Sequence, residues 1–439
     1  VTILLLWLLT LECFTIIGWT LRKRDRMIQF PFLAASVFLG WMLPQLVGLT
    51  NHPFLPEGGL EKTIFMAMLC LGAAWVGYTF NQRPAQLLWW RFDQRRLLWG
   101  SAALSLIGAF FFYQVSLLAA TVTAETGGQW TGIITIYVFM SRLLSIGMVV
   151  AIVLYLNKRS WPTLLIILFD LMFYLNRIVI KGRRADMIEL GLMVLMVLWF
   201  YRHWLPPRWM MALVLAVGAL VINSIGDYRS IMMGEDRTTW SGAGLGDILE
   251  IDYVGNIMSL ASGDAGNHDL TNAVMDIAAV DRQLSFDFGL THWNGIINAY
   301  VPAQWLGKDV KQSLMIDFGN LAYSEFRHVP YTGSTRTGLS DAFRSFWYFG
   351  AIKFFLIGLI MSRWYKAAIK GNIVAQMIVI LIVTVSLHAI THSTDLFFAG
   401  FIQLAVFLLP VLIFARVGKF QNNKPCITSS SNSRISPIR

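Results

Sequence analysis

About eleven long apolar runs dominate this sequence, and each is long enough to cross a membrane. A helix needs roughly 17 to 25 apolar residues to span about 30 Å of hydrocarbon. Hydrophobic residues make up 56% of the chain and charged residues only 14%. We therefore expect an all-α polytopic membrane protein of about 11 spans, or 12 with a missing or atypical N-terminal segment. The runs are 2–21, 29–50, 63–80, 98–122, 132–156, 161–180, 186–202, 209–225, 346–362, 373–391 and 397–415.

The basic residues predict how these spans are oriented, because Lys and Arg collect in cytoplasmic loops. They cluster in alternate connections, whereas the intervening short loops 51–61, 123–131 and 391–396 contain none. This pattern places the amino terminus outside and the carboxyl terminus inside. The net charge of +10 belongs to the cytoplasmic rim and does not indicate binding to nucleic acid.

The spacing of the spans divides the chain into four parts. We expect transmembrane helices 1–8 within residues 1–225 and one large periplasmic loop over 226–345. Apolar residues recur in that loop at three- and four-residue spacings, which predicts mainly helical structure. Three further transmembrane helices are expected within 346–416, followed by a Ser-rich, disordered cytoplasmic tail over 417–439.

Four basic residues occupy the short turn between two spans, on the side predicted to face outward. Lys and Arg are normally scarce there, so these charges favour a ligand. At the end of membrane helices, the natural ligand is an anionic headgroup such as a phosphate or pyrophosphate. The four residues are Arg177, Lys181, Arg183 and Arg184.

A second charged cluster lies where the large loop enters the next span. Arg336, Asp341 and Arg344 occur within TRTGLSDAFRSF. Asp341 and Arg344 are three residues apart and would share one helical face. They form either an ion pair at the start of the helix or part of a functional site. Lys353, further along, is expected to extend toward the headgroups.

Other ionisable residues within or near spans are also candidates for function or pairing. Arg142 and Asp170 lie on adjacent spans and are expected to pair. His388, His392 and Asp395 have four- and three-residue spacings that would place them on one helical face. That group is either a structural hydrogen-bonded cluster, a general base or a metal site.

Near the loop exit the chain resembles the oligosaccharide repeat-unit polymerases of bacterial surface glycans, the Wzy or O-antigen polymerase group. The resemblance rests on the many spans, the large late loop and a few short motifs. Family members often have Asn and Gly where this chain has Ser345 and Trp347. The motifs are Ser340-Asp341-Ala342-Phe343, Phe349-Gly350 and the basic turn Gly182-Arg183-Arg184.

This resemblance implies a GT-C-like, metal-independent glycosyltransferase in the bacterial inner membrane, with no cofactor. Its donor would be an oligosaccharide on undecaprenyl pyrophosphate, and its acceptor a sugar hydroxyl on a second lipid-linked repeat unit. Membrane lipids, a chain-length regulator and a flippase are the implied partners. The expected bases are Asp341, then His328, then His392. The residues expected to bind pyrophosphate are Arg177, Lys181, Arg183, Arg184, Arg336 and Arg344.

Two other functions fit the same pattern. An O-antigen ligase would use the same donor but transfer the glycan to lipid A core, and a histidine of the large loop acting on the acceptor would favour it. A non-enzymatic transporter or flippase for lipid-linked glycan would instead hold its charges in a central cavity. The large loop on one side favours an enzyme over a transporter.

Overall fold

The computed structural model describes residues 1–80, 83–86, 90–126, 133–232, 241, 244–263, 268–301, 303–317, 321–330 and 334–419. Within these ranges, nine helices are long and apolar enough to cross a membrane, or ten if a bent pair counts as one span. The prediction of an all-α polytopic membrane protein is confirmed at this level. Of the eleven predicted runs, 186–202 is helical as α9 but is not among these nine, and 209–225 lies in the bent pair.

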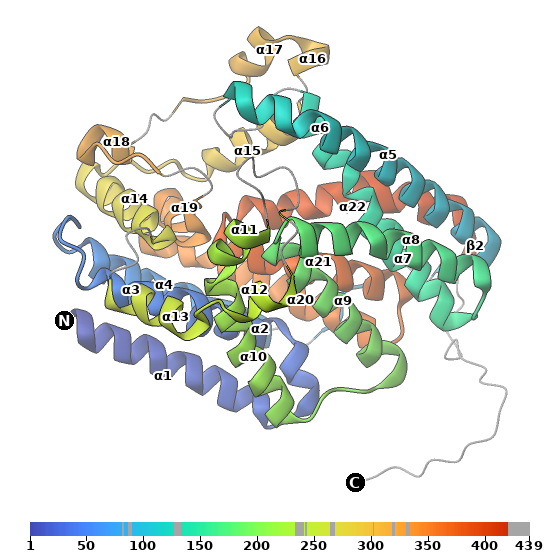
Figure 1. Ribbon diagram of the computed structural model, residues 1–439, viewed down its shortest axis with the longest axis horizontal. Helices are drawn as coiled ribbons and strands as arrows, with labels where there is room; N and C mark the ends of the chain where they lie inside the picture. The colour runs from blue at the N-terminus through green and yellow to red at the C-terminus, as the bar shows by residue number, and fades with distance from the viewer. Residues whose placement is uncertain are drawn as a thin grey trace.

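The candidate spans include both continuous and broken helices (Figure 1). The continuous ones are α1 (Thr2–Leu21), α4 (Gly59–Phe80), α5 (Gln94–Thr126), α21 (Ile373–Thr391) and α22 (Asp395–Ala415). The broken ones are α2–η2–α3 (Phe30–Val37, Phe38–Met42, Leu43–Leu49), α6–α7 (Ile133–Ser141, Leu143–Asn157), α8–η3 (Trp161–Leu175, Asn176–Ile180) and α19–η4–α20 (Thr337–Phe346, Trp347–Ala351, Ile352–Ile369). Helix α9 covers Arg184–Arg202, and α10 (Arg208–Asn223) bends by 58° into α11 (Ile225–Met232).

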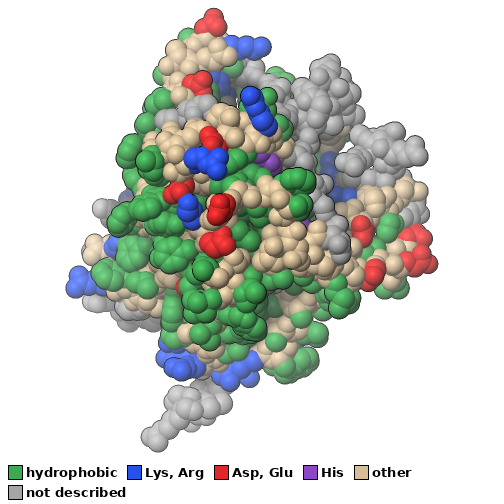
Figure 2. Space-filling view, turned by 90° about the vertical axis from the view of Figure 1, so that its left-hand side faces the viewer, with side chains coloured by type: hydrophobic (Ala, Val, Ile, Leu, Met, Phe, Trp, Pro, Cys, Tyr) green, Lys and Arg blue, Asp and Glu red, His purple; other side chains and the backbone are tan. Residues whose placement is uncertain are grey.

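Short helices of the region predicted as a large loop gather at one end of the bundle, which we call the loop end. There α14 packs against α4, α18 and α19, and α19 also packs against α21. Figure 2 shows this end, with acidic and basic side chains next to one another. The short helices are α12 (Leu245–Leu249), α13 (Tyr253–Ser262), α14 (Asp269–Gln283), α15 (Leu290–Tyr300), α16 (Ala303–Leu306), α17 (Lys308–Ser313) and α18 (Leu321–Phe326). The short helix η1 (Arg24–Ile28) follows the C-terminal end of α1.

A short antiparallel ribbon joins the end of α22 to the start of α5. Strand β1 (Trp90–Phe92) pairs with β2 (Arg416–Lys419), with Arg91 opposite Gly418. Regular structure therefore extends into the first residues of the predicted tail. The rest of that tail, 420–439, lies outside the described residues.

Two breaks in the spans carry arginines, of which Arg177 is buried and Arg142 is exposed. The π-helical turn η3 carries Arg177, and Arg142 lies at the break between α6 and α7. Insertions of this kind are frequent at functional sites because they shift side chains out of the regular helical register. The hydrophobic runs in the sequence do not reveal these breaks.

Helices α4 and α20 approach each other closely through two glycines. A Cβ atom on Gly77 would lie 2.1 Å from the carbonyl oxygen of Phe355, and one on Gly358 would lie 2.2 Å from that of Ala74. Small residues let backbones approach in this way inside membranes, where van der Waals packing holds helices together. Because α20 follows α19 directly, this contact also positions the loop exit.

Replacing Gly358 with Val should destabilise the protein by about 1–3 kcal/mol, because the added carbons meet backbone rather than a movable side chain. The measurement is the melting temperature of the purified protein in detergent. Gly18→Val is the matched control, since a Cβ there meets nothing within 4 Å. Equal melting temperatures for the two variants would contradict the close contact.

Candidate functional site

The basic turn, residues 177–184, is held in place by α11. Gly182 closes it with a positive φ of 53°, which glycine adopts without steric cost. The Tyr228 hydroxyl donates to the Val179 carbonyl at 2.7 Å, and Arg229 Nε donates to the Gly182 carbonyl at 3.1 Å. The turn is therefore packed against α11, at the start of the region predicted as a large loop.

Arg177, on η3, is buried beside this turn. Its Nη1 lies 3.1 Å from Asp186 Oδ1, and its Cζ lies 4.7 Å from the centre of the Tyr174 ring. Its Nε and Nη2 atoms are buried and have no hydrogen-bond partner among the described residues. Asp186 thus neutralises the charge of Arg177 but leaves two donors unsatisfied.

Positive charges crowd one another around the turn. Burial lowers the pKa of Lys181, and the neighbouring Arg183 and Arg177 lower it further. Burial also lowers the pKa of Arg183; Asp186 opposes this shift, while Arg177 and Arg142 add to it. Because these cations repel one another in a partly buried place, binding of an anion would be favourable.

One face of α14 connects the basic turn to the loop exit. Arg184 lies 3.7 Å from Asp269 and Arg336 lies 3.9 Å from Asp276, measured between nitrogen and carboxylate oxygen. Between these carboxylates, Asn272 donates to the Thr335 carbonyl at 3.0 Å. The spacing of three and four residues places all three α14 side chains on one face. The two cationic segments predicted from sequence are therefore held on the same helix.

Each arginine of the loop exit has its own carboxylate. Arg344 Nε lies 3.5 Å from Asp287 Oδ2, a buried oxygen. Burial raises the pKa of Asp276, and the charges of Arg336 and Arg344 oppose that rise. The ion pair between Asp341 and Arg344, one of the two alternatives that the sequence left open, is not formed, because the side chain of Arg344 reaches Asp287 instead.

Asp341 belongs to a separate buried network. Its Oδ1 lies 3.3 Å from Lys353 Nζ, and its Oδ2 accepts from the backbone N–H of Thr394 at 3.0 Å and from the Thr394 hydroxyl. His292 Nε2 lies 3.7 Å from the same Oδ2 and 2.9 Å from Thr394 Oγ1. Lys353 also donates to Ser345 Oγ at 2.7 Å. Three parts of the chain distant in sequence, α15, α19–η4–α20 and the residues before α22, therefore meet at one carboxylate.

Sequence reasoning missed most of this network. Lys353 was expected to extend toward the headgroups, but its side chain is only 9% exposed. A lysine in an apolar segment is costly without a partner, so its presence was a signal for a nearby carboxylate. The contributions of His292 and Thr394 had no such signal, because they depend on how α15 and α22 fold onto α19.

The three residues predicted on one helical face are divided between two helices. Helix α21 ends at Thr391, and Asp395 begins α22. The His388 and His392 rings meet edge to face, with centroids 5.2 Å apart. Burial lowers the pKa of His392, as does Arg184, while Asp269 raises it. His392 therefore lies between the basic turn and α14, and the single-face prediction is wrong.

His328 lies on the same face of α14 as the cationic segments. Its Nε2 is 2.8 Å from Asn272 Oδ1. Burial lowers the pKa of His328, which favours the neutral ring. Asn272 therefore contacts both the His328 ring and the Thr335 carbonyl, which directly precedes Arg336.

A small polar cavity of about 40 Å³ lies deeper in the bundle, between α7, α9, α21 and α22. Arg142, Glu189 and His388 line it. A water molecule needs roughly 10–15 Å³, so the cavity has room for water. The predicted pairing of Arg142 with Asp170 is wrong, because Asp170 accepts from Ser105 Oγ at 2.7 Å and Arg142 faces the cavity.

The short connection 392–394 between α21 and α22, which we call the α21–α22 junction, touches both clusters. His392 faces Arg184 and Asp269, and Thr394 binds Asp341. Thr335, next to Arg336, donates to the Thr391 carbonyl at 2.7 Å. The candidate site is therefore a cationic region on one side of this junction and a buried acid on the other.

Within the described ranges, no group of three or more His, Cys, Asp or Glu side chains is arranged to hold a metal ion. In comparisons with known proteins, no family model matches this chain, and neither a curated protein nor a solved structure is significantly similar to it. The site must therefore be interpreted from its own geometry.

Asp341→Leu or Lys353→Met alone should destabilise the protein by about 3–5 kcal/mol, because each leaves a buried charge unpaired. The Asp341→Leu, Lys353→Met double variant should lose less than the sum of the two single effects. Melting temperatures in detergent measure this coupling. Strictly additive losses would show that the two charges do not depend on each other. Arg282→Ala, which breaks the exposed pair with Glu325, is the control with an expected loss below about 1 kcal/mol.

Proposed function

We propose that this protein is a membrane glycosyltransferase that polymerises lipid-linked oligosaccharide repeat units. The reaction would move a glycan from a polyprenyl pyrophosphate to a sugar hydroxyl of another lipid-linked unit. The observation that supports this most is the crowding of Arg142, Arg177, Lys181 and Arg183, next in sequence to Arg184, which faces His392. A pyrophosphate carried by a membrane lipid matches both the charge and the location at the end of the spans.

The basic turn would stabilise the leaving group. As the acceptor oxygen attacks the anomeric carbon, the bond from that carbon to the pyrophosphate oxygen breaks and its electrons pass to the phosphate. Preorganised guanidinium groups stabilise such developing charge most strongly where water is scarce. Arg177 offers two buried N–H groups without partners among the described residues, and Arg184 can leave its 3.7 Å contact with Asp269 for a phosphate oxygen.

His392 is the group best suited to take the acceptor proton. Its depressed pKa keeps the ring neutral near pH 7, and it lies next to Arg184. Its Nδ1 shares a hydrogen bond of 2.8 Å with Thr391 Oγ1, so Nε2 would receive the proton. His328 is also neutral and lies on the neighbouring face of α14, where it can orient the sugar.

Asp341 is better suited to position the site than to act as a base. Both of its oxygens are occupied, one by Lys353 and the other by Thr394. Through Thr394 it fixes the α21–α22 junction, and thereby the location of His392. We therefore assign Asp341 a positioning role, in place of the direct role that its sequence context favours.

We also propose how the protein is oriented in the membrane. The loop end would face the periplasm, the amino terminus would lie outside and the bundle would sit in a bacterial inner membrane with about eleven spans. The alternate loops rich in Lys and Arg support this orientation. A flippase that delivers the lipid-linked unit and a chain-length regulator would be its functional partners.

A ligase that transfers the glycan to lipid A core is the second candidate. His292 supports it, because this histidine of the large loop lies 3.7 Å from Asp341 and 3.2 Å from Lys353. A ligase needs lipid A core as a separate acceptor, whereas a polymerase needs only the lipid-linked repeat unit. Purified protein given only the lipid-linked repeat unit should make a ladder of multiples if it is a polymerase and no ladder if it is a ligase.

Arg183→Ala and Arg184→Ala should each reduce the ladder-forming rate by about 100-fold or more, since each removes a donor to the departing pyrophosphate. The assay uses protein in nanodiscs with an undecaprenyl-pyrophosphate-linked repeat unit, read on a gel. Lys at either position should rescue poorly, because an ammonium cannot bind two phosphate oxygens as a guanidinium does.

The matched control is Arg282→Ala, which removes an exposed loop arginine paired with Glu325 and should leave the rate unchanged. Full activity in both turn variants would overturn the assignment of the basic turn.

The rate should also survive excess chelator, because the proposed chemistry uses arginines and a histidine. Loss of the ladder with EDTA, and its return with an added divalent cation, would show that the reaction needs a metal.

A further inference from the structure

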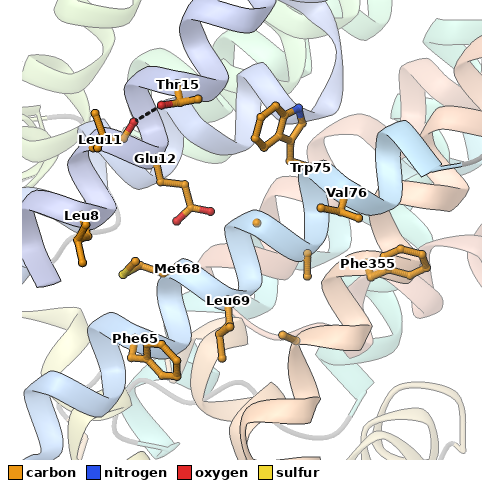
Figure 3. A pocket seen from close by; sticks show the side chains of 13 residues that line it. Leu8, Leu11, Glu12, Thr15, Phe65, Met68, Leu69, Trp75, Val76 and Phe355 are labelled. Carbon is orange, nitrogen blue, oxygen red and sulfur yellow. Dashed lines mark hydrogen bonds between the residues drawn. The ribbon is translucent and has the colours of Figure 1, made fainter.

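A wide groove with a single carboxyl group opens on the bundle surface between α1, α4 and α20. Its volume is about 700 Å³, and most of its lining is apolar (Figure 3). Glu12 points into it from α1, above the helix that carries Met68 and Leu69. The Oε2 atom of Glu12 is buried and has no hydrogen-bond partner among the described residues.

The position of Glu12 along α1 limits what can satisfy it. Glu12 is the eleventh of the twenty residues of α1, so at 1.5 Å per residue it lies about 15 Å from either end. A lipid carries its hydrogen-bond donors at the headgroup, near the ends of the span, and only hydrocarbon at this depth. A cationic partner for Glu12 at this depth would therefore come from another polypeptide.

Small residues in the lining of the groove leave room for a helix. Gly72, Ala73 and Ala351 line it between the larger side chains of Phe65 and Phe355. A Cβ atom on Gly72 would lie 2.9 Å from Glu12 Oε1, so the absence of a side chain there makes room for the carboxyl. Small residues of this kind let a second helix backbone approach closely within a membrane.

We propose that this groove binds a transmembrane helix of a partner protein that carries a Lys or Arg near its midpoint. The cation would pair with Glu12, and the helix backbone would lie over Gly72 and Ala73. Apolar surface alone gives no preference among helices in lipid, so the charge pair would provide the selectivity. This inference concerns a face of α1 and α4 and does not depend on the proposed glycosyltransferase activity.

The test uses two synthetic Leu/Ala transmembrane peptides, one with a single central Lys and one with Leu in that position. A photo-crosslinking amino acid at Phe65, on the groove wall, reports contact in nanodiscs. The Lys peptide should crosslink at least several-fold more than the Leu peptide. A third peptide, with its Lys moved close to one end, should behave like the Leu peptide because its charge no longer reaches the depth of Glu12.

Two variants test the cause of the preference. Glu12→Leu should abolish the difference between the peptides, and Ala73→Leu, which fills the groove but keeps the carboxyl, should lower crosslinking of both. Phe14→Leu is the matched control, because Phe14 is a lipid-exposed residue of α1 outside the groove lining.

Equal crosslinking of the Lys and Leu peptides to the unsubstituted groove would overturn the proposal, and so would a preference that survives Glu12→Leu. A dominant crosslink to lipid would reassign the groove to a hydrocarbon chain. A dominant crosslink to another copy of this protein would reassign it to self-association.

Discussion

Pairing of buried charge is the constraint on which the rest of this structure depends. An ionised side chain within an apolar bundle is costly unless another group satisfies it. The Asp341 carboxylate meets this requirement with Lys353 and Thr394, and through them it joins α19, α20 and the start of α22. Arg177 and Asp186 do the same between η3 and α9. These contacts link the broken spans at the loop end to one another.

The same constraint explains why the candidate anion site lies where it does. On α14, Asp269 and Asp276 hold one arginine each from two distant segments. In the basic turn, burial lowers the pKa values of Lys181 and Arg183, and neighbouring cations lower them further. A ligand with several negative oxygens would lower the repulsion among these cations. The pyrophosphate that we propose as part of the substrate has that charge.

On the outer surface of the bundle, Glu12 also has a buried carboxylate oxygen without a partner among the described residues. Its carboxyl lies at mid-depth beside Gly72, far from the charged loop end. Because lipid cannot satisfy it there, a basic residue of a neighbouring helix is the chemically matched partner. We thus propose two different ligands, an anionic headgroup beside the crowded cations of the basic turn and a cationic helix beside Glu12.

The sequence by itself determined the class of the protein and its general plan. Runs of apolar residues predict spans because their length must match the membrane, and the basic turn stands out because its charges oppose the usual distribution. Tertiary structure decided which charges meet. Asp341 pairs with Lys353 rather than Arg344, and His392 lies apart from the helix of Asp395. Hydrophobic runs do not encode the helix breaks at Arg142 and Arg177, and pairing between distant segments depends on packing that no local pattern specifies.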